Sequence, residues 1–303
     1  MKNIRAYMKE KEGDYKEKIR MHRQSKARFF LTIIGIIVFV SLALFLYHKL
    51  RIYNDYTIKS VIERTESSAS VTVQLGENMV SYSKDGASCV SVNGGKIWNQ
   101  TYEMQKPLVD VTGKCIAITD YNGRDIYVMD SEKILGTIST NMPVKNIAVS
   151  ESGIVAAILE DGSTTWIYVY DTKGNVLVYS KTKMSNSGYP VEVALSPDAT
   201  LMAVSYLYID SGAMRSSVGF YNFGEVGQNE LHNYVSGYNY TDSIVPYVKF
   251  LNDEVAVAVA DDRIMFYGGG QKPAVIGETL LSQEILSIYQ SGEYVGLVFE
   301  NTE

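Results

Sequence analysis

Histidine, cysteine and acidic side chains are the groups from which this 303-residue chain would build a catalytic or metal site. It has three histidines, His22, His48 and His232, and only the last lies well beyond the apolar segment described below. A Ser-His-Asp triad would have to use His232, and no G-x-S-x-G elbow accompanies it. Three histidines so far apart do not form a histidine-based zinc site. We therefore predict no catalytic triad, no metal site and no cofactor, and interpret His232 as a surface or loop residue.

Two cysteines, Cys89 and Cys115, lie in the apolar segments ASCVSV and KCIAIT. They either form a disulfide or are two buried small hydrophobes, and the apolar settings favour the second interpretation. Between Asp120 and Asp125 the chain resembles a calcium loop, but it lacks the ligands and the distal Glu of an EF-hand. Asn122-Gly123 between two apolar runs is better explained as a type I′ hairpin turn.

Tyrosines gather in the segment 223–246, which reads FGEVGQNELHNYVSGYNYTDSIVP. Tyrosine offers a rigid apolar face with a polar tip, and mixtures of Tyr with Asn, Ser and Gly suit protein or glycan recognition. Tyr234, Tyr238, Asn239 and Tyr240 are therefore the candidate binding surface. The alternative is that these tyrosines pack an outer strand and hold a long loop in place.

An uncharged apolar run covers 29–47 and is long enough to cross a bilayer as a helix. Phe29, Phe30 and Tyr47 stand at its ends, where aromatic rings favour the membrane interface. A cleaved signal peptide is the rival interpretation, but no A-x-A cleavage site follows and the preceding stretch is long. We predict an uncleaved transmembrane signal anchor.

Charge is divided unevenly on the two sides of this run. Residues 1–28 hold ten basic and four acidic residues, a net charge of +6, whereas the remainder holds 18 basic and 30 acidic residues, a net charge of −12. Positive segments stay in the cytoplasm, so the N-terminus should be cytoplasmic and 48–303 extracellular. The basic residues nearest the span, which we take as topology determinants, are Arg20, Arg23, Lys26 and Arg28. The mixed charge signs of this segment argue against nucleic-acid binding, and attraction of these four basic residues to anionic lipid is the simpler role.

Beyond residue 70 the chain becomes a series of short apolar runs separated by Gly, Asn, Asp and Pro, which is typical of strands and turns. One unit of four strands repeats, and its most hydrophobic strand begins at Met79, Cys115, Ile154, Leu201, Val255 and Tyr294. Four strands per 40–50 residues are typical of the blades of a β-propeller. We predict an all-β propeller over 71–303, with 48–70 as a juxtamembrane linker or closing strand.

About 5.5 four-stranded blades are visible, because five full units are followed by two strands of a sixth. A propeller is stable when its ring closes and leaves no long unpaired edge. The expectation is that the propeller is truncated at its C-terminus and has seven or eight blades when complete. The alternative is that an early segment, 56–62, closes the ring.

Several phrases resemble a family of single-pass, membrane-anchored β-propeller proteins of Gram-positive, clostridial-type bacteria. They are YSKDGASCVSVNGGKIWNQTYEM (82–104), NSGYPVEVALSPDATLMAVSY (186–206), VGFYNFGEVGQNELHNYV (218–235) and YVGLVF (294–299). The resemblance covers nearly the whole chain and implies a fold related to WD-repeat and YVTN-like propellers. Ala199 stands where such blades usually have Gly, and the chain has no Trp-Asp dipeptide. The resemblance supplies no catalytic residues.

The leading functional hypothesis is a non-catalytic module that binds a protein or a cell-wall glycan at the cell envelope, because a rigid propeller presents loops without needing catalytic residues. One alternative is a propeller lyase or hydrolase acting on an envelope polymer, with Asp110, Glu192, Asp261 or Asp262 around the channel. Another is a structural subunit of an envelope assembly.

Overall fold

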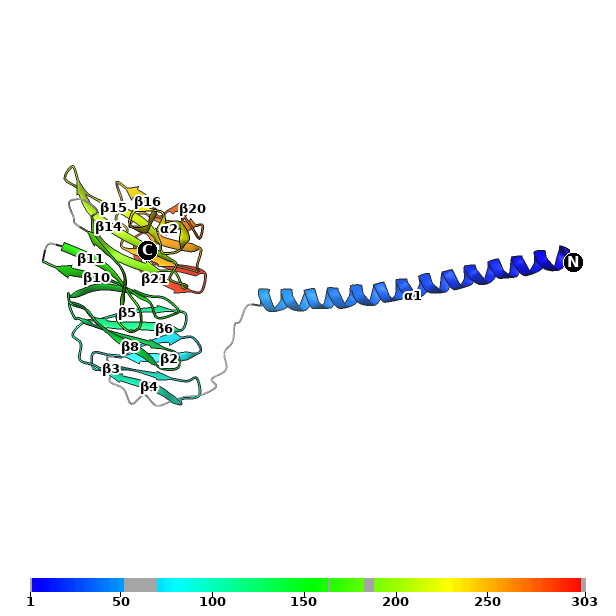
Figure 1. The fold of residues 1–303 in the computed structure, drawn as a ribbon, viewed down its shortest axis with the longest axis horizontal. Coiled ribbons are helices and arrows are strands. Elements are labelled where there is room, and N and C mark those ends of the chain that lie inside the picture. Colours follow the sequence, from blue (N-terminus) through cyan, green and yellow to red (C-terminus); the bar gives the residue numbers. More distant parts are fainter. Residues whose placement is uncertain (1, 52–69, 163, 183–187, 301–303) are drawn as a thin grey trace. The chain divides into compact units, whose positions relative to one another are not determined.

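The computed structural model of the protein describes residues 2–51, 70–162, 164–182 and 188–300 (Figure 1). The chain divides into two units, Met1–Val61 and Ile62–Glu303, which are described separately. Most of the expected linker 48–70, including the segment 56–62 that could close the ring, lies outside the described residues.

The first unit contains one long helix, α1 (Lys2–Leu50). Its part from Arg28 to Leu50 is long and apolar enough to cross a membrane, and none of it is buried against other parts of the protein. The apolar part of the helix therefore begins one residue before the predicted span of 29–47 and ends three residues after it. A helix that carries apolar side chains on every face, and that no other part of the protein covers, requires an apolar environment such as a lipid bilayer.

The second unit consists of antiparallel sheets that follow one another along the chain (Figure 1). Sheet one contains β1 (Val71–Leu75), β2 (Asn78–Tyr82), β3 (Gly86–Val90) and β4 (Lys96–Thr101). Sheet two contains β5 (Pro107–Thr112), β6 (Cys115–Asp120), β7 (Asp125–Asp130) and β8 (Ile134–Ser139). Sheet three contains β9 (Val144–Val149), β10 (Val155–Asp161), β11 (Thr164–Tyr170) and β12 (Val176–Thr182).

Sheet four contains β13 (Tyr189–Leu195), β14 (Leu201–Asp210), β15 (Ala213–Asn222) and β16 (Tyr234–Tyr240), with the short helices α2 (Glu225–Gln228) and η1 (Leu231–Asn233) before its last strand. Sheet five contains β17 (Tyr247–Phe250), β18 (Val255–Val259), β19 (Arg263–Gly268) and β20 (Ala274–Leu280). Sheet six, as far as it is described, contains β21 (Ile285–Ser291) and β22 (Tyr294–Phe299).

This order confirms the predicted all-β propeller of five four-stranded units and two strands of a sixth. The second strands begin within one residue of the six positions that the repeat indicated. The spacing was informative because the second strands of sheets two to five are apolar and largely buried, as expected of strands that are covered on both faces. Along β6 and β10 the first five residues are all buried, so these strands read as continuous apolar runs.

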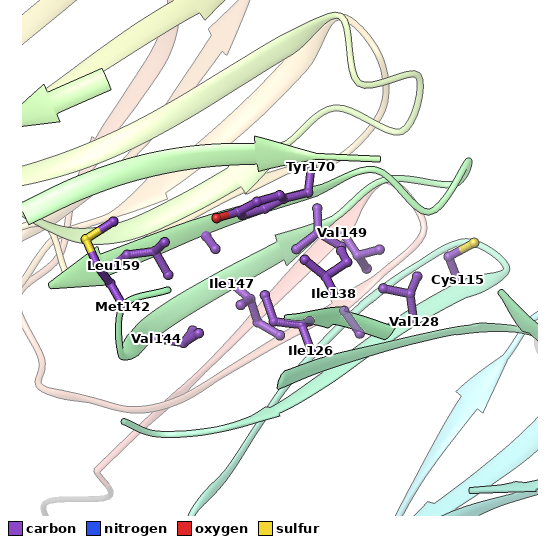
Figure 2. Close-up of a cluster of buried hydrophobic side chains, with 13 residues drawn as sticks. Cys115, Ile126, Val128, Ile138, Met142, Val144, Ile147, Val149, Leu159 and Tyr170 are labelled. Atoms are coloured by element: carbon purple, nitrogen blue, oxygen red, sulfur yellow. The ribbon is translucent and has the colours of Figure 1, made fainter. Parts of the chain in front are cut away.

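Hydrophobic layers hold neighbouring sheets together. Figure 2 shows the layer between sheets two and three, where Ile126 and Ile138 of sheet two meet Val144 and Ile147 of sheet three. Cys115 belongs to this layer and Cys89 to the one between sheets one and two. Both cysteines are free and buried, and burial raises the pKa of the Cys115 thiol to about 11. They act as small hydrophobes, which was the favoured alternative.

The first strand of each sheet lies at the centre. β5, β9, β13 and β17 lie side by side in that order, and residues from all six sheets line one cavity at the end of the channel between them. The side chains of the first strands therefore converge even though their positions are far apart in the sequence.

Two turns bear on the sequence analysis: one differs from the predicted type, and the other accounts for the position where related blades have Gly. The hairpin at Asn122-Gly123 exists, but it is not a type I′ turn, because only Asn122 has a positive φ (67°) and four residues separate β6 from β7. At the turn of Ser196-Pro197-Asp198, Ala199 adopts φ 61°. This is the left-handed conformation that explains why related blades have Gly there.

Replacing Ala199 by Gly should raise the free energy of unfolding by about 1 kcal/mol, since a Cβ in the left-handed region costs roughly that amount. Gly162 is the matched control: it has φ +59° and no atom within 4 Å of an added Cβ, so Gly162→Ala should lower stability by about the same amount through the backbone alone. Denaturant unfolding followed by Trp fluorescence measures both. Equal stability of Ala199→Gly and the native chain would contradict the assignment.

Candidate functional site

The channel carries a group of polar side chains, one or two from each of four consecutive first strands. Asp110 comes from β5, Asn146 from β9, Glu192 from β13, and Tyr247 and Lys249 from β17. Three of these strands place one polar residue between apolar ones, as in VDV, VEV and VKF, and β9 carries two polar residues in succession, Lys145 and Asn146. Side chains alternate between the faces of a strand, so a single polar residue among apolar neighbours is turned away from the hydrophobic layers. We call these five residues the channel cluster.

An ion pair joins two of these strands. The Lys249 ammonium donates to Oδ1 of Asp110, and Oδ2 of the same carboxylate accepts the backbone N–H of Val149 at 2.7 Å. Both ionic side chains are only 17% exposed. A partly buried pair of this kind must remain paired, because removing one partner leaves an uncompensated charge that costs about 3–5 kcal/mol.

A second contact fixes the other carboxylate. The Asn146 side-chain N–H group donates to Oε2 of Glu192 at 2.8 Å and to the backbone oxygen of Val191 at 3.1 Å. The Asn146 oxygen accepts the backbone N–H of Ile147 at 2.7 Å, which sets the orientation of the amide. The amide is thus a fixed donor to Glu192.

The charges of the channel cluster do not balance, since two carboxylates face one ammonium. Burial and the neighbouring Asp110 charge, opposed by Asn146 and Lys249, together raise the pKa of Glu192 to about 7. Burial, together with the charges of Asp110 and Glu192, also raises the pKa of Tyr247 to about 12. Glu192 is therefore protonated below about pH 7 and loses its proton above it.

A cavity of about 620 Å³ lies at the channel end where the first strands turn into the second strands. Lys249 and Thr112 line it together with Glu151, Gln74 and Gln290. Among the described residues that line it, neither Asp110 nor Glu192 is included. A ligand in this cavity would meet the Lys249 end of the cluster and not its carboxylates.

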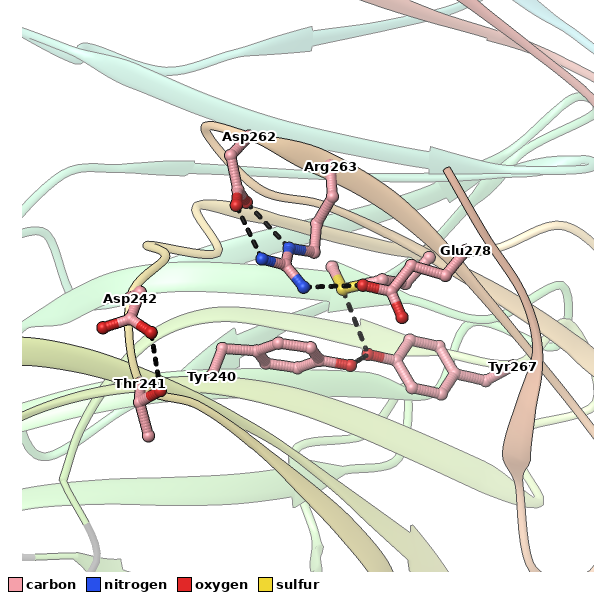
Figure 3. A network of polar contacts seen from close by, with 8 residues as sticks. Tyr240, Thr241, Asp242, Asp262, Arg263, Tyr267 and Glu278 are labelled. Carbon is pink, nitrogen blue, oxygen red and sulfur yellow. Dashed lines mark hydrogen bonds and ion pairs between the residues drawn. The ribbon is translucent and has the colours of Figure 1, made fainter. Parts of the chain in front are cut away.

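The four carboxylates suggested for an enzyme separate into two groups. The structure brings Asp110 and Glu192 together but places Asp261 and Asp262 in the turn between β18 and β19. There, Oδ1 of Asp261 accepts the backbone N–H of Ile244 at 3.0 Å. Asp262 pairs with Arg263, which also contacts Glu278 (Figure 3). The hydrogen bonds from Arg263 hold the pKa of Asp262 below its usual value.

The candidate binding residues all lie on β16, but their side chains are not equivalent. Tyr238 and Tyr240 are half-buried against the layer between sheets four and five. The Tyr238 hydroxyl donates to the backbone oxygen of Pro273 at 3.0 Å, and the Tyr240 hydroxyl bonds to that of Tyr267 (Figure 3). Asn239 and Tyr234 are exposed. Packing therefore accounts for Tyr238 and Tyr240, whereas the ring of Tyr234 remains accessible to a ligand.

His232 lies in η1 with an exposed side chain and a positive φ of 56°. In the part of the chain that the structure describes, no group of three or more His, Cys, Asp or Glu residues could hold a metal ion.

At the anchor, Phe29, Phe30 and Tyr47 are about 60% exposed at the two ends of the apolar part of α1. Lys26 and Arg28 are also exposed, whereas the side chains of Arg20 and Arg23 lie outside the described residues.

Sequence reasoning missed Asn146, Tyr247 and Lys249. A signal for them exists, because the first strand of four consecutive repeats carries at least one polar residue within an otherwise apolar run. Comparing the repeats at that position would have found Asp110, Asn146, Glu192 and Lys249 as a set.

A family model described as a family of unknown function, DUF5711, matches residues 49–303. The chain belongs to this family. No curated protein sequence matches the chain. Among solved structures, the chain is similar to KlAtg21 in its complex with the coiled-coil of AgAtg16, with 16% identity, a TM-score of 0.50 and coverage of 74% of each chain.

Two further structures are similar to this DUF5711 member. They are the Neurospora crassa Pan2 WD40 domain, with 11% identity, a TM-score of 0.49 and coverage of 75% of this chain and 70% of that chain, and Kluyveromyces lactis Hsv2, with 11% identity, a TM-score of 0.47 and coverage of 76% and 70%. At such identities the likeness concerns the fold, and it agrees with a WD40-like propeller.

Glu192→Gln should change how stability depends on pH. Because the pKa of Glu192 is raised from 4.5 to about 7, the folded chain keeps a proton that the unfolded chain loses between these values. The free energy of unfolding of the native chain should therefore fall as pH rises through that window, by on the order of 3 kcal/mol. The Gln variant should lack this component and be more stable than the native chain at pH 8.

Urea unfolding at a series of pH values measures this effect. Glu132→Gln is the control, because Glu132 is exposed and should leave the pH profile unchanged. A profile of Glu192→Gln that runs parallel to that of the native chain would show that Glu192 is not the group that holds the proton.

Proposed function

We propose that this DUF5711 protein is a single-pass membrane protein whose propeller acts as a non-catalytic protein-interaction module on the extracellular side of a Gram-positive cell envelope. The observation that carries the proposal is the uncovered apolar part of α1, Arg28–Leu50, in the same chain as a propeller. Such a helix needs a lipid environment, and the propeller is thereby held at a membrane surface.

The proposed orientation follows from the charges around the apolar run. The excess of Lys and Arg in 1–28 favours a cytoplasmic N-terminus, and residues 29–303 carry a net charge of −12. The acidic propeller would then face away from the anionic cytoplasmic leaflet, which attracts the basic segment.

An interaction role is supported by how the channel polar groups are used. Lys249 and Asp110 bond to each other, and Asn146 bonds to Glu192, so the cluster stabilises the central strands. The similar KlAtg21 structure was determined as a complex with a coiled-coil, which shows that a propeller of this general fold can bind a protein segment. Propellers present rigid edges and loops to partners without needing catalytic groups.

A second function, an enzyme acting on an envelope polymer, has one observation in its favour. Glu192 has a pKa of about 7, which suits a general acid or base. Its carboxylate is engaged by Asn146 and does not line the 620 Å³ cavity, so the interaction role has the better support.

The orientation can be tested with alkaline phosphatase fused to the C-terminus, since this enzyme is active only outside the cytoplasm. The native chain should give active phosphatase. Neutralising the four basic residues nearest the span should increase the inverted fraction several-fold, because nearby Lys and Arg set topology. The residues to be replaced by Gln are Arg20, Arg23, Lys26 and Arg28.

The matched control removes the same number of basic residues farther from the span, by replacing Lys2, Arg5, Lys9 and Lys11 with Gln. It should have a smaller effect. An inactive phosphatase on the native chain would overturn the proposed orientation.

The interaction role can be tested in native membranes with a membrane-impermeant, amine-reactive crosslinker. The full chain should form at least one discrete adduct with another protein, and a solubilised, unfolded chain should not. The enzyme alternative would gain instead from a chain that forms no adduct but degrades an envelope polymer, with that activity abolished by Glu192→Gln.

A further inference from the structure

A wedge-shaped cavity of about 950 Å³ opens at the outer side of the propeller, between β12 of sheet three and the strands β14–β16 of sheet four. We call it the β12 wedge. On one side it touches four consecutive residues of β12, from Tyr179 to Thr182. Neighbouring residues of a strand point to opposite faces, so a cavity that reaches all four borders the backbone edge of the strand.

The edge of β12 at this cavity has free hydrogen-bonding groups. β12 pairs with β11 along one side, and within the described residues its other side makes no backbone hydrogen bond. The strand also exposes large apolar side chains, since Val176, Leu177 and Tyr179 are 47–63% exposed. Unpaired groups on an exposed apolar edge strand are a template for another extended chain.

The opposite wall of the wedge is aromatic. Gly219 of β15 and Gly237 of β16 face each other in register, and the ring of Tyr234 lies over them. A Cβ at Gly237 would stand 1.7 Å from the Tyr234 hydroxyl, so only glycine leaves room for the ring. Tyr221 packs edge-on against Tyr234 at 5.5 Å and bonds through its hydroxyl to Tyr206 at 2.6 Å. These contacts hold the aromatic rings of the wall in place without a ligand.

A smaller cavity of about 90 Å³ lies beside the wedge and shares Ser180 and Tyr221 with it. Apolar side chains of both sheets, including Val178, Met202 and Phe223, form most of its other walls, and His232 and Asn233 complete the lining. Its size and lining suit one aliphatic side chain, as the alternate pockets beside an added strand do.

Charge beside β12 favours one sign of ligand. Glu230 lies on the rim of the wedge, but its carboxylate is paired with Lys272 at 2.6 Å. Lys181 is exposed, packs over the ring of Trp166 at 5.0 Å, and has no ion-pair partner among the described residues. Trp166 packs against the layer between sheets two and three, so the Lys181 side chain lies on the face of β12 opposite to the wedge. A strand added to β12 would meet one uncompensated positive charge on that face.

We infer that the β12 wedge binds an extended segment of a partner protein, which adds to sheet three as a fifth strand. Its aliphatic side chain would fill the 90 Å³ cavity, its next outward-facing residues would lie on Tyr234, and an acidic residue would pair with Lys181. A glycan has no row of N–H and C=O groups at the spacing of a strand, so the free edge of β12 selects a peptide. This inference rests on the proposed interaction role and identifies where the partner binds.

The test uses the full chain in lipid nanodiscs and, as probe, a displayed library of random twelve-residue peptides. Enriched peptides should alternate aliphatic and other residues and carry an Asp or Glu. A synthetic copy of the most enriched peptide should bind the native chain, and Ser180→Trp, which fills the wedge and the small cavity, should weaken binding at least tenfold. Lys181→Glu should weaken it several-fold, and exchanging the acidic residue of the peptide for Lys should restore it.

The matched control is Thr137→Trp, the same change of a hydroxyl residue to Trp on the outer strand β8 of sheet two, where residue 137 is exposed. It should leave binding unchanged, and thermal unfolding of each variant verifies that it is folded. The inference is overturned if no peptide is enriched, if Ser180→Trp binds as the native chain does, or if an oligosaccharide displaces the peptide. A Ser180→Trp chain that still forms the native crosslinked adduct would refute this location and leave the interaction role standing.

Discussion

The second strands of sheets two to five are covered on both faces, and the packing of these sheets depends on this constraint. β6, β10 and β18 are almost entirely buried, as are the first six residues of β14, so a single sheet would expose an apolar strand to water. Stacking each sheet between two neighbours removes that exposure and at the same time brings the first strands together. The channel cluster is a consequence, because polar residues of the first strands cannot enter the hydrophobic layers on either side.

The polar residues at the centre are compatible with this packing only because they bond to one another. Lys249 compensates Asp110, and Asn146 holds Glu192, while the remaining charge is avoided by keeping a proton on Glu192. At the outer side the sheets diverge, and the β12 wedge opens where no such compensation is required. The residues at the centre thus contribute to the stability of the propeller, whereas the residues of the outer strands can differ without disturbing the central packing.

The sequence was sufficient to predict the elements that depend on local pattern. The onset of each second strand, the apolar helix and the buried cysteines follow from runs of apolar residues. Contacts between sheets could not be predicted in the same way, because Asn146 and Glu192 are neighbours only when two sheets stack in a particular register. The tyrosines of β16 show a similar limit: their alternation was visible, but the side that packs on sheet five was not.

The ion pair between Lys249 and Asp110 joins residues that are 139 positions apart in the chain. Sheets three and four lie between them in the sequence, so this contact can form only after both have been synthesised and stacked. Contacts of such long range slow folding, because the entropy of closing the intervening chain is lost before the contact contributes. During synthesis, sheets one and two would be stacked with one apolar face still uncovered, and the protein would then be most exposed to aggregation and to proteases.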